Sequence, residues 1–226
     1  IKTAGAGRNL KEARQPAVFD LSNRGRILVF GVGSISSGIP APWAAETNQP
    51  GIHLVDLDSS GAAAQIQQTV ERFSRPDDLV VVSIHWGSNW GYDIPRAQGR
   101  VARVLIENTD VNVVHGHSSH HVKGIEVYRD RPILYGCGDL LTDYEGIEGY
   151  EWFRDDLGLM YFVHVDTDSG ELDHLNMTPT HLHQLQIEHA AARDIEWLIE
   201  VYNREYRSLG TQLELTPEHQ LTLNYE

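Results

Sequence analysis

Apolar and polar positions follow one another along the chain in blocks that predict strands separated by helices. The apolar run 79–84 ends in His-Trp-Gly at 85–87, and a second run, 111–114, ends in His-Gly-His-Ser-Ser-His-His at 115–121. Pro95 opens a helix-length segment between them. Two short apolar runs joined by a helix are typical of a βαβ unit. The histidine-bearing ends are therefore expected to lie side by side, at the sheet edge where open α/β proteins bind ligands.

The rest of the chain divides into two parts with different periodicity. Before the βαβ unit, the sequence predicts a short helix near Asn9, strands at 17–19, 26–30 and 51–57, a turn at 22–25, a loop at 31–51, and a helix from cap candidates at 58–60 to Phe73. From Gly124 onward it predicts hairpins within 125–135 and 159–177, a helix at about 189–207 and a terminal extension at 213–225. No repeat or linker interrupts the pattern, so we expect one domain, 1–226, with two sheets.

Charge narrows the class of partner. The chain has 18 Lys and Arg residues against 32 Asp and Glu residues, a formal net charge of −14, which argues against a nucleic acid or an anionic membrane surface. No apolar run approaches the roughly 20 residues of a membrane span, so the chain is expected to be soluble. The single cysteine, Cys137, cannot form an internal disulfide. It is interpreted as a small packing residue.

The histidines after the two runs are candidate metal ligands. A lone histidine such as His85 at a strand end is more often structural, but His117 and His120 lie three residues apart beside Gly116 and can reach the same centre. Neutral imidazoles bind zinc, manganese or iron, and ligand type alone does not choose among these divalent metals. We interpret His85, His117 and His120 as ligands. His121 is a candidate acid or base, or else a structural imidazole.

Two further features can contribute to substrate binding. Asp139 opens a glycine-flanked acidic turn with Asp143 and Glu145, which can orient a histidine, bind a substrate amine, or only cap a helix and face solvent. Trp86 can line the rim of a pocket or pack in the core. We treat Trp86 and Asp139 as candidate substrate-binding residues.

Together these motifs resemble the CapA family of capsule and poly-γ-glutamate synthesis proteins, within the calcineurin-like metallophosphoesterase superfamily. The resemblance is carried by the segments 5–13, 85–87, 116–120, 124–128 and 133–139. It implies the C-terminal portion of a four-layer α/β/β/α sandwich with a dinuclear metal site, to which His85, His117 and His120 contribute. The family's earlier motif blocks have no counterpart here and are expected upstream of Ile1. This chain also has Ser-Ser where many relatives have His-Pro, and Asp139 where many have Asn.

The resemblance implies a role in capsule synthesis and leaves its chemistry open. The first hypothesis is metal-dependent hydrolysis of a phosphorylated or peptide-like substrate, in which the metal lowers the pKa of a bound water. The second is non-catalytic binding of an anionic polymer during assembly or export, and the third is metal-dependent isomerisation. The resemblance leaves the bacterial cytoplasm and the cell envelope open as compartments, and it leaves the substrate and the oligomeric state open as well.

Overall fold

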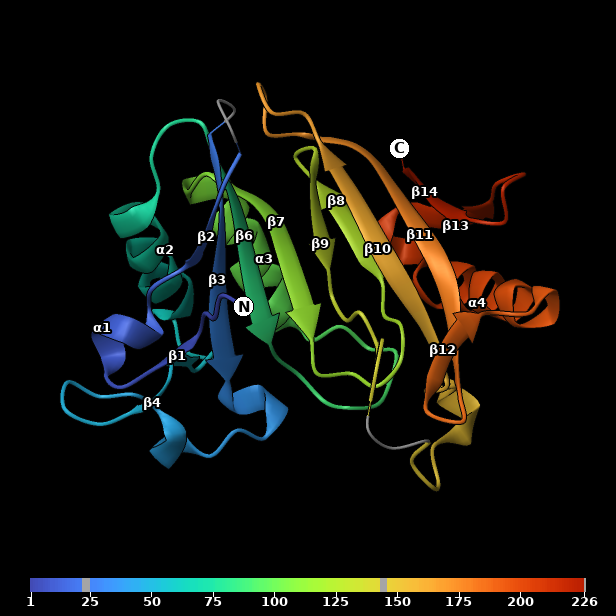
Figure 1. Ribbon diagram of the computed structural model, residues 1–226, viewed down its shortest axis with the longest axis horizontal. Helices are drawn as coiled ribbons and strands as arrows, with labels where there is room; N and C mark the ends of the chain where they lie inside the picture. The colour runs from blue at the N-terminus through green and yellow to red at the C-terminus, as the bar shows by residue number, and fades with distance from the viewer. Residues whose placement is uncertain (22–24, 143–145, 226) are drawn as a thin grey trace.

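A seven-stranded sheet occupies the first half of the computed structural model, which describes residues 1–21, 25–142 and 146–225 (Figure 1). Its order is β2-β3-β6-β7-β9-β8, with β5 beside β3. The strands are β2 (Ala17–Asp20), β3 (Arg26–Ser34), β5 (Leu54–Val55), β6 (Asp78–His85), β7 (Val111–His117), β8 (Ile125–Tyr128) and β9 (Arg131–Leu134). Strands β3, β6, β7 and β9 run parallel to one another, and β2 and β8 pair antiparallel to them. The histidine-bearing ends of β6 and β7 therefore meet at one edge of the sheet.

Two helices cover one face of this sheet. They are α2 (Ala62–Phe73) and α3 (Arg96–Asn108), and α3 connects β6 to β7 as the βαβ pattern predicts. Phe30 and Val82 of the sheet pack against Ile66 of α2 and Leu105 of α3 in one buried cluster. Burying each such side chain stabilises the fold by about 1.5–3 kcal/mol. The helix layer is therefore held by the apolar stripes that the sequence displays.

A second sheet packs toward the other face. Within the described residues its order is β10-β11-β14-β13, with β12 beside β11. Its strands are β10 (Leu157–Val165), β11 (Leu172–His183), β12 (Gln186–His189), β13 (Thr211–Leu215) and β14 (Leu221–Tyr225). Leu159 and Met177 share a buried cluster with Leu134 of the first sheet and Leu198 of α4 (Ala192–Glu205). The predicted mixed α/β architecture with two large sheets is confirmed.

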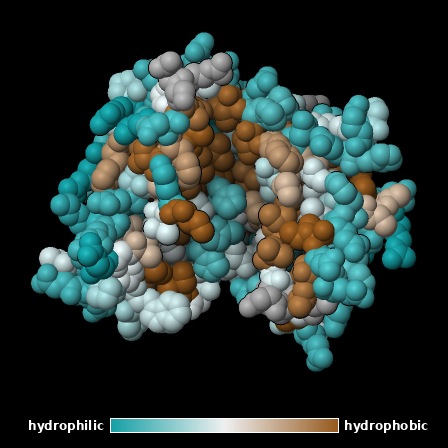
Figure 2. Space-filling model, in the orientation of Figure 1, coloured by the Kyte–Doolittle hydropathy of each residue, from teal (hydrophilic) through white to brown (hydrophobic). Residues whose placement is uncertain are grey.

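The two sheets leave an open hollow between them. It has a volume of about 770 Å³ and takes its walls from both sheets, including Val81 and Val113 on one side and Val163 and Val165 on the other. Figure 2 shows hydrophobic residues lining this hollow in the middle of the molecule. His115 also lines it, so the hollow extends toward the histidine-bearing ends of the strands.

The N-terminal segment lies against the end of β3. Strand β1 (Ala6–Gly7) pairs with β4 (Gly51–Ile52), and α1 (Leu10–Ala13) starts at Asn9, whose side chain accepts a hydrogen bond from the Glu12 N–H. The prediction of a loop throughout 31–51 is wrong at its start, because β3 continues to Ser34. A Cβ on Gly31 would lie 2.9 Å from Gly5 Cα. Glycine at 31 thus permits a close chain crossing rather than a turn.

The described chain also contains short 3₁₀ segments, and α2 begins at a different residue from the one predicted. The 3₁₀ segments are η1 (Ile35–Ser37), η2 (Ala41–Trp43), η3 (Glu151–Phe153) and η4 (Arg207–Leu209). Helix α2 is capped at Gly61, not at 58–60, which form the preceding turn. Most of the predicted turn at 22–25 lies outside the described residues. Among the helices that the structure describes, none has the length and apolar character needed to cross a membrane.

Candidate functional site

His85 and His117 face each other at the carboxyl ends of β6 and β7. They are register partners in the parallel ladder, so the backbone itself brings them together. Their Nδ1 atoms are 3.0 Å apart and their ring centroids 4.9 Å apart. One Nδ1 must carry a proton and the other accept it for this contact to be a hydrogen bond. The prediction that the two histidine-bearing strand ends adjoin is confirmed at the level of the side chains.

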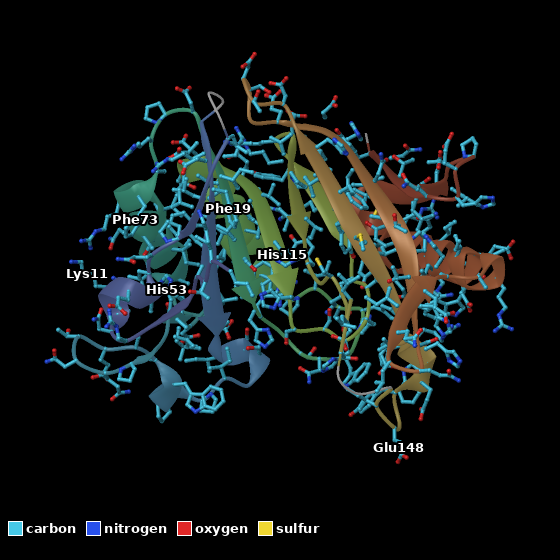
Figure 3. All side chains as sticks on the ribbon, in the orientation of Figure 1. Lys11, Phe19, His53, Phe73, His115 and Glu148 are labelled. Carbon is cyan, nitrogen blue, oxygen red and sulfur yellow. The ribbon has the colours of Figure 1, made fainter. Side chains whose placement is uncertain are left out.

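Burial keeps this group of imidazoles neutral. Burial lowers the pKa of His117 to about 4, with smaller contributions from the charges of His115 and His85. Burial, with the nearby charge of His120, also lowers the pKa of His85. His115 extends the row, with its Nδ1 3.0 Å from Ser83 Oγ, its ring 5.5 Å from that of His117, and a pKa lowered by burial (Figure 3). Neutral imidazoles have a lone pair available for a metal or a proton.

His120 is hydrogen-bonded to Asp139. The His120 Nδ1 lies 2.9 Å from the Asp139 Oδ2, although the residues are 19 positions apart. A carboxylate only accepts, so Nδ1 carries the proton and Nε2 is the basic nitrogen. The His120 N–H also donates to the Asn89 carbonyl at 3.0 Å, which joins the loops after β6 and β7. Of the roles considered for Asp139, orientation of a histidine is the one seen here. Asp143 and Glu145 lie outside the described residues.

Trp86 lies beneath the histidine site and not at its rim. It is 2% exposed, stacks on Tyr135 with centroids 6.0 Å apart, and donates from Nε1 to the Tyr135 carbonyl at 2.9 Å. Gly116 makes room for it, because a Cβ there would meet the indole and lie 2.6 Å from the Leu134 carbonyl oxygen. Of the two interpretations of Trp86, the structure therefore shows core packing. Gly116 serves the packing of the indole.

His121 is packed among aromatic rings. It is 1% exposed, its centroid lies 4.7 Å from that of Phe153 and 5.0 Å from that of Tyr92, and burial lowers its pKa to about 4. Its Nδ1 is 3.1 Å from the Val122 carbonyl, and its Nε2 is buried without a partner among the described residues. Such a group cannot exchange a proton with a substrate while the packing stays intact. The position of His121 thus favours its interpretation as a structural imidazole over its interpretation as an acid or base.

An aromatic surface covers one side of the site. Trp90 lies against His120, with centroids 5.2 Å apart, and stacks on Tyr150 at 4.3 Å and an interplanar angle of 2°. Trp152 extends this surface and is 62% exposed. The sequence analysis did not single out Tyr150 and Trp152. The aromatic run Tyr-Glu-Trp-Phe at 150–153 is visible in the sequence. The sequence around it does not indicate that this run lies next to the ends of β6 and β7.

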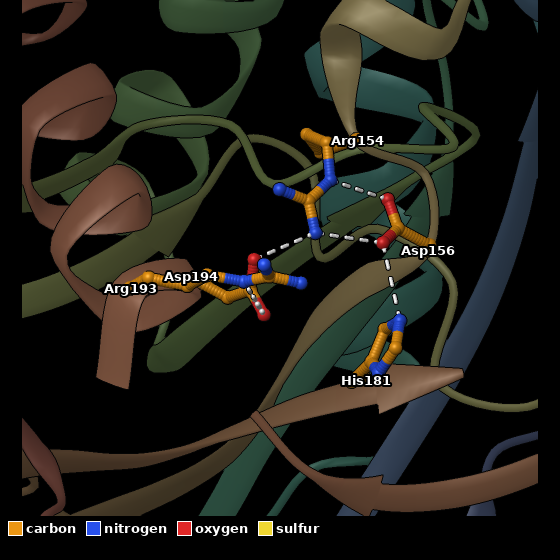
Figure 4. Close-up of polar contacts among 5 residues, drawn as sticks. All are labelled: Arg154, Asp156, His181, Arg193 and Asp194. Atoms are coloured by element: carbon orange, nitrogen blue, oxygen red, sulfur yellow. Dashed lines mark hydrogen bonds and ion pairs between the residues drawn. The ribbon is translucent and has the colours of Figure 1, made fainter. Parts of the chain in front are cut away.

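A charged network attaches this aromatic segment to the second sheet and α4. Arg154 donates to both carboxylate oxygens of Asp156 at 2.8 Å and to Asp194 at 2.9 Å (Figure 4). His181 lies 3.3 Å from Asp156, and Arg193 lies 3.7 Å from Asp194. Bidentate guanidinium–carboxylate pairs fix orientation as well as distance. The network therefore anchors the chain immediately after Phe153, next to the rings that pack on His120 and His121.

The distance between His85 and His117 is close to the spacing of two nitrogen ligands on one metal ion. Two nitrogen ligands of a tetrahedral ion with bonds of about 2.0–2.1 Å lie roughly 3.3 Å apart, close to the 3.0 Å between the His85 and His117 nitrogens. His120, the predicted third ligand, contacts Asp139 through Nδ1. Within 1–21, 25–142 and 146–225, no three His, Cys, Asp or Glu side chains are grouped so as to hold an ion. Of the three predicted ligands, the structure thus brings His85 and His117 together.

Comparisons with known proteins identify a common group of relatives. A family model described as "Bacterial capsule synthesis protein PGA_cap" matches residues 1–144. A probable polyglutamine synthesis accessory protein of Mycobacterium tuberculosis is 40% identical over 222 residues, 98% of this chain and 58% of that protein. The PGA biosynthesis protein CapA of Bacillus subtilis is 25% identical over 184 residues, 81% of this chain and 44% of that protein. The chain thus spans about half the length of these relatives.

Among solved structures, the crystal structure of a phosphatase from Mycoplasma pneumoniae is similar over 85% of this chain and 61% of the phosphatase chain, with 11% identity and a TM-score of 0.49.

Proposed function

The chain belongs to the bacterial capsule synthesis protein family PGA_cap, and from this membership we propose that it acts in the synthesis of an anionic capsule polymer through its histidine site. The resemblance to the CapA family that the motifs indicated is confirmed by these matches. The relatives named for polyglutamine or PGA synthesis motivate a polyglutamate chain, or a phosphorylated or peptide-like precursor of it, as the substrate. The observation that carries the proposal is the convergence of His85 and His117 at adjacent parallel strand ends.

The chemistry that this arrangement supports best is metal-assisted hydrolysis. His85 and His117 would hold a divalent ion, with further ligands from outside the described set. When bound, such an ion polarises the substrate oxygen and lowers the pKa of a bound water to about 7. The low pKa of His117 keeps it neutral at pH 7, which is the form that a ligand requires. The ligand pair thus needs no deprotonation at neutral pH.

We assign proton transfer to His120 rather than to His121. Asp139 fixes the His120 tautomer with its proton on Nδ1 and stabilises the imidazolium when Nε2 takes up a proton. The His120 side chain is 19% exposed, whereas His121 is enclosed by rings. The aromatic surface of Trp90, Tyr150 and Trp152 lies next to this imidazole and would position the substrate.

The test uses the natural polypeptide that contains these 226 residues. Divalent metal content and hydrolysis of a model phosphodiester and of a γ-glutamyl peptide are measured for the wild type and for His117→Ala. Because His117 is half of the converging pair, we expect the variant to lose bound metal and turnover together. His189→Ala, on exposed β12, is the matched control and should keep both. Unchanged metal content and turnover in His117→Ala would remove the proposal.

A non-catalytic role is the second candidate. It is favoured by the observation that only two imidazole nitrogens of the described residues converge, which is fewer than the three protein ligands of a usual catalytic zinc site. In this case a metal would bridge the polymer's carboxylates to the protein. Metal-dependent retention of polyglutamate without any cleavage, lost in His117→Ala, would favour binding over hydrolysis.

A further inference from the structure

A small pocket between α1 and α2 is lined by cations and by no carboxylate. Its volume is about 200 Å³, far more than the roughly 10–15 Å³ that one water needs. The lining residues are Lys11, Arg14, Gln68, Thr69, Arg72 and Phe73. Figure 3 shows Lys11 and Phe73 on the α1 and α2 side of the molecule, apart from His115. The pocket is therefore separate from the histidine site.

The three cations of the pocket lack acidic partners in the described chain. Neither Lys11, Arg14 nor Arg72 forms a salt bridge with a described carboxylate, while Arg8, one turn away, is paired with Glu12. In a protein with a net charge of −14, acidic groups are abundant. Lys11 and Arg72 are exposed and Arg14 is half-buried, so water screens part of the repulsion among the three charges, and an anion bound among them would relieve the rest.

Three buried nitrogen atoms on Arg14, which lines the pocket, and on the nearby His53 have no hydrogen-bond partner among the described residues. The Arg14 Nε is buried without a partner among the described residues, and so are both ring nitrogens of His53, which is 2% exposed. Burial and the positive charge of Arg14 lower the pKa of His53 to about 4, so His53 adds no fourth positive charge at neutral pH. A buried guanidinium donor without an acceptor is costly. An acceptor supplied by a ligand would satisfy it.

The location of these residues at helix ends explains part of the pattern. Arg14 is the C-cap of the one-turn helix α1 and Arg72 lies in the last turn of α2, where the helix dipole favours positive charge. The helix dipole explains one cation at the C-terminal end of each helix. It does not account for three cations closing around one cavity, nor for the buried Arg14 Nε.

We propose that the pocket between α1 and α2 binds an oxyanion through Lys11, Arg14 and Arg72. A guanidinium matches carboxylate and phosphate oxygens with paired donors, and the ammonium of Lys11 adds a point charge. Phosphate and the carboxylate of an acidic chain share this chemistry. The pocket can therefore take a phosphoryl group or a carboxylate that reaches the outer helical face of the protein.

The experiment titrates the protein with inorganic phosphate and, in a separate arm, with a short γ-glutamyl oligomer, by isothermal calorimetry. Wild-type protein should bind at least one of them saturably. Because charge-assisted hydrogen bonds are lost, Arg14→Gln and Arg72→Gln should each weaken binding about tenfold or more. Arg207→Gln removes the same charge from exposed η4 and should leave the affinity unchanged.

Thermal unfolding with and without saturating phosphate or oligomer gives a second readout on each variant. The ligand should raise the midpoint of the wild type and of Arg207→Gln equally and that of Arg14→Gln by clearly less, provided that each variant melts cooperatively on its own. The absence of saturable binding in both arms would overturn the proposal and leave the cations as helix-end charges. Equal weakening by Arg207→Gln and Arg14→Gln would also overturn it, because it would indicate general attraction to positive charge.

Discussion

Replacing Gly116 by alanine tests whether this glycine is required by the packing of Trp86. Strand β7 is paired on both sides, with β6 and β9, so its backbone has little room to shift. The new Cβ would meet the Trp86 indole, 2.7 Å from Cε2, and the Leu134 carbonyl oxygen at 2.6 Å. Trp86 must therefore move, and its hydrogen bond to the Tyr135 carbonyl would be lost.

The expected magnitude follows from these two contacts. The lost hydrogen bond costs about 1–3 kcal/mol, and overpacking of a filled core costs about another 1–3 kcal/mol. Gly116→Ala should thus lower the free energy of unfolding by about 2–6 kcal/mol, a large share of the roughly 5–15 kcal/mol typical of a domain. Urea denaturation followed by circular dichroism measures this loss.

Two further variants isolate the cause of the loss. Gly61→Ala adds the same methyl group where nothing lies within 4 Å and should change stability by less than about 1 kcal/mol. In Trp86→Phe the indole nitrogen is absent, so adding Gly116→Ala to it should cost about 1–3 kcal/mol less than adding it to the wild type. A loss below about 0.5 kcal/mol in Gly116→Ala, or a loss that Trp86→Phe does not reduce, would refute the packing argument.

Three other outcomes are expected from buried or tethered groups. Burial lowers the pKa of Lys123 to about 8, so between about pH 8 and 10.5 the unfolded chain holds a proton that the folded chain has lost. Stability should therefore rise across that window by up to about 3 kcal/mol, and Lys123→Met should abolish this increment in urea titrations at pH 7 and 10. Arg154→Ala should release the segment that stacks on Trp90 and accelerate amide exchange at 150–153 about tenfold, while β6 amides stay protected. Burial raises the pKa of Cys137 to about 12, so its thiol should react with a disulfide reagent at pH 8 at least about a hundredfold more slowly in native than in urea-unfolded protein.

The sequence was most informative where one periodicity ran without interruption. The apolar runs at β6 and β7 and the stripe on α3 predicted a parallel pair with adjacent histidine-bearing ends, and the pairing of His85 with His117 agrees with that prediction. Glycine was ambiguous. Gly31 and Gly33 suggested a loop, but they allow Ala4, Gly5, Ile39 and Ile52 to lie directly against β3. Only the tertiary structure distinguishes these two uses of glycine.

The partners of individual site residues could not be predicted from local sequence. The contact of His120 with Asp139 joins two loops across β8 and β9. Trp86 is buried because its pocket is formed by Gly116 of β7 and by Tyr135, which directly follows β9. Likewise, the terminal extension at 213–225 is a hairpin, β13 and β14, whose turn between Thr216 and Gln220 lacks the glycine that usually marks one.

His85 and His117 are fixed by the sheet, whereas the aromatic residues beside them lie on a segment outside it. The backbones of β6 and β7 in the middle of the sheet set the spacing of the two imidazoles. The pair is therefore preorganised, and little side-chain entropy is lost when a ligand binds. The rings of residues 150–153 lie outside either sheet and depend on the Arg154 tether. Substitutions in that segment can therefore retune what the protein recognises while the imidazole pair stays intact.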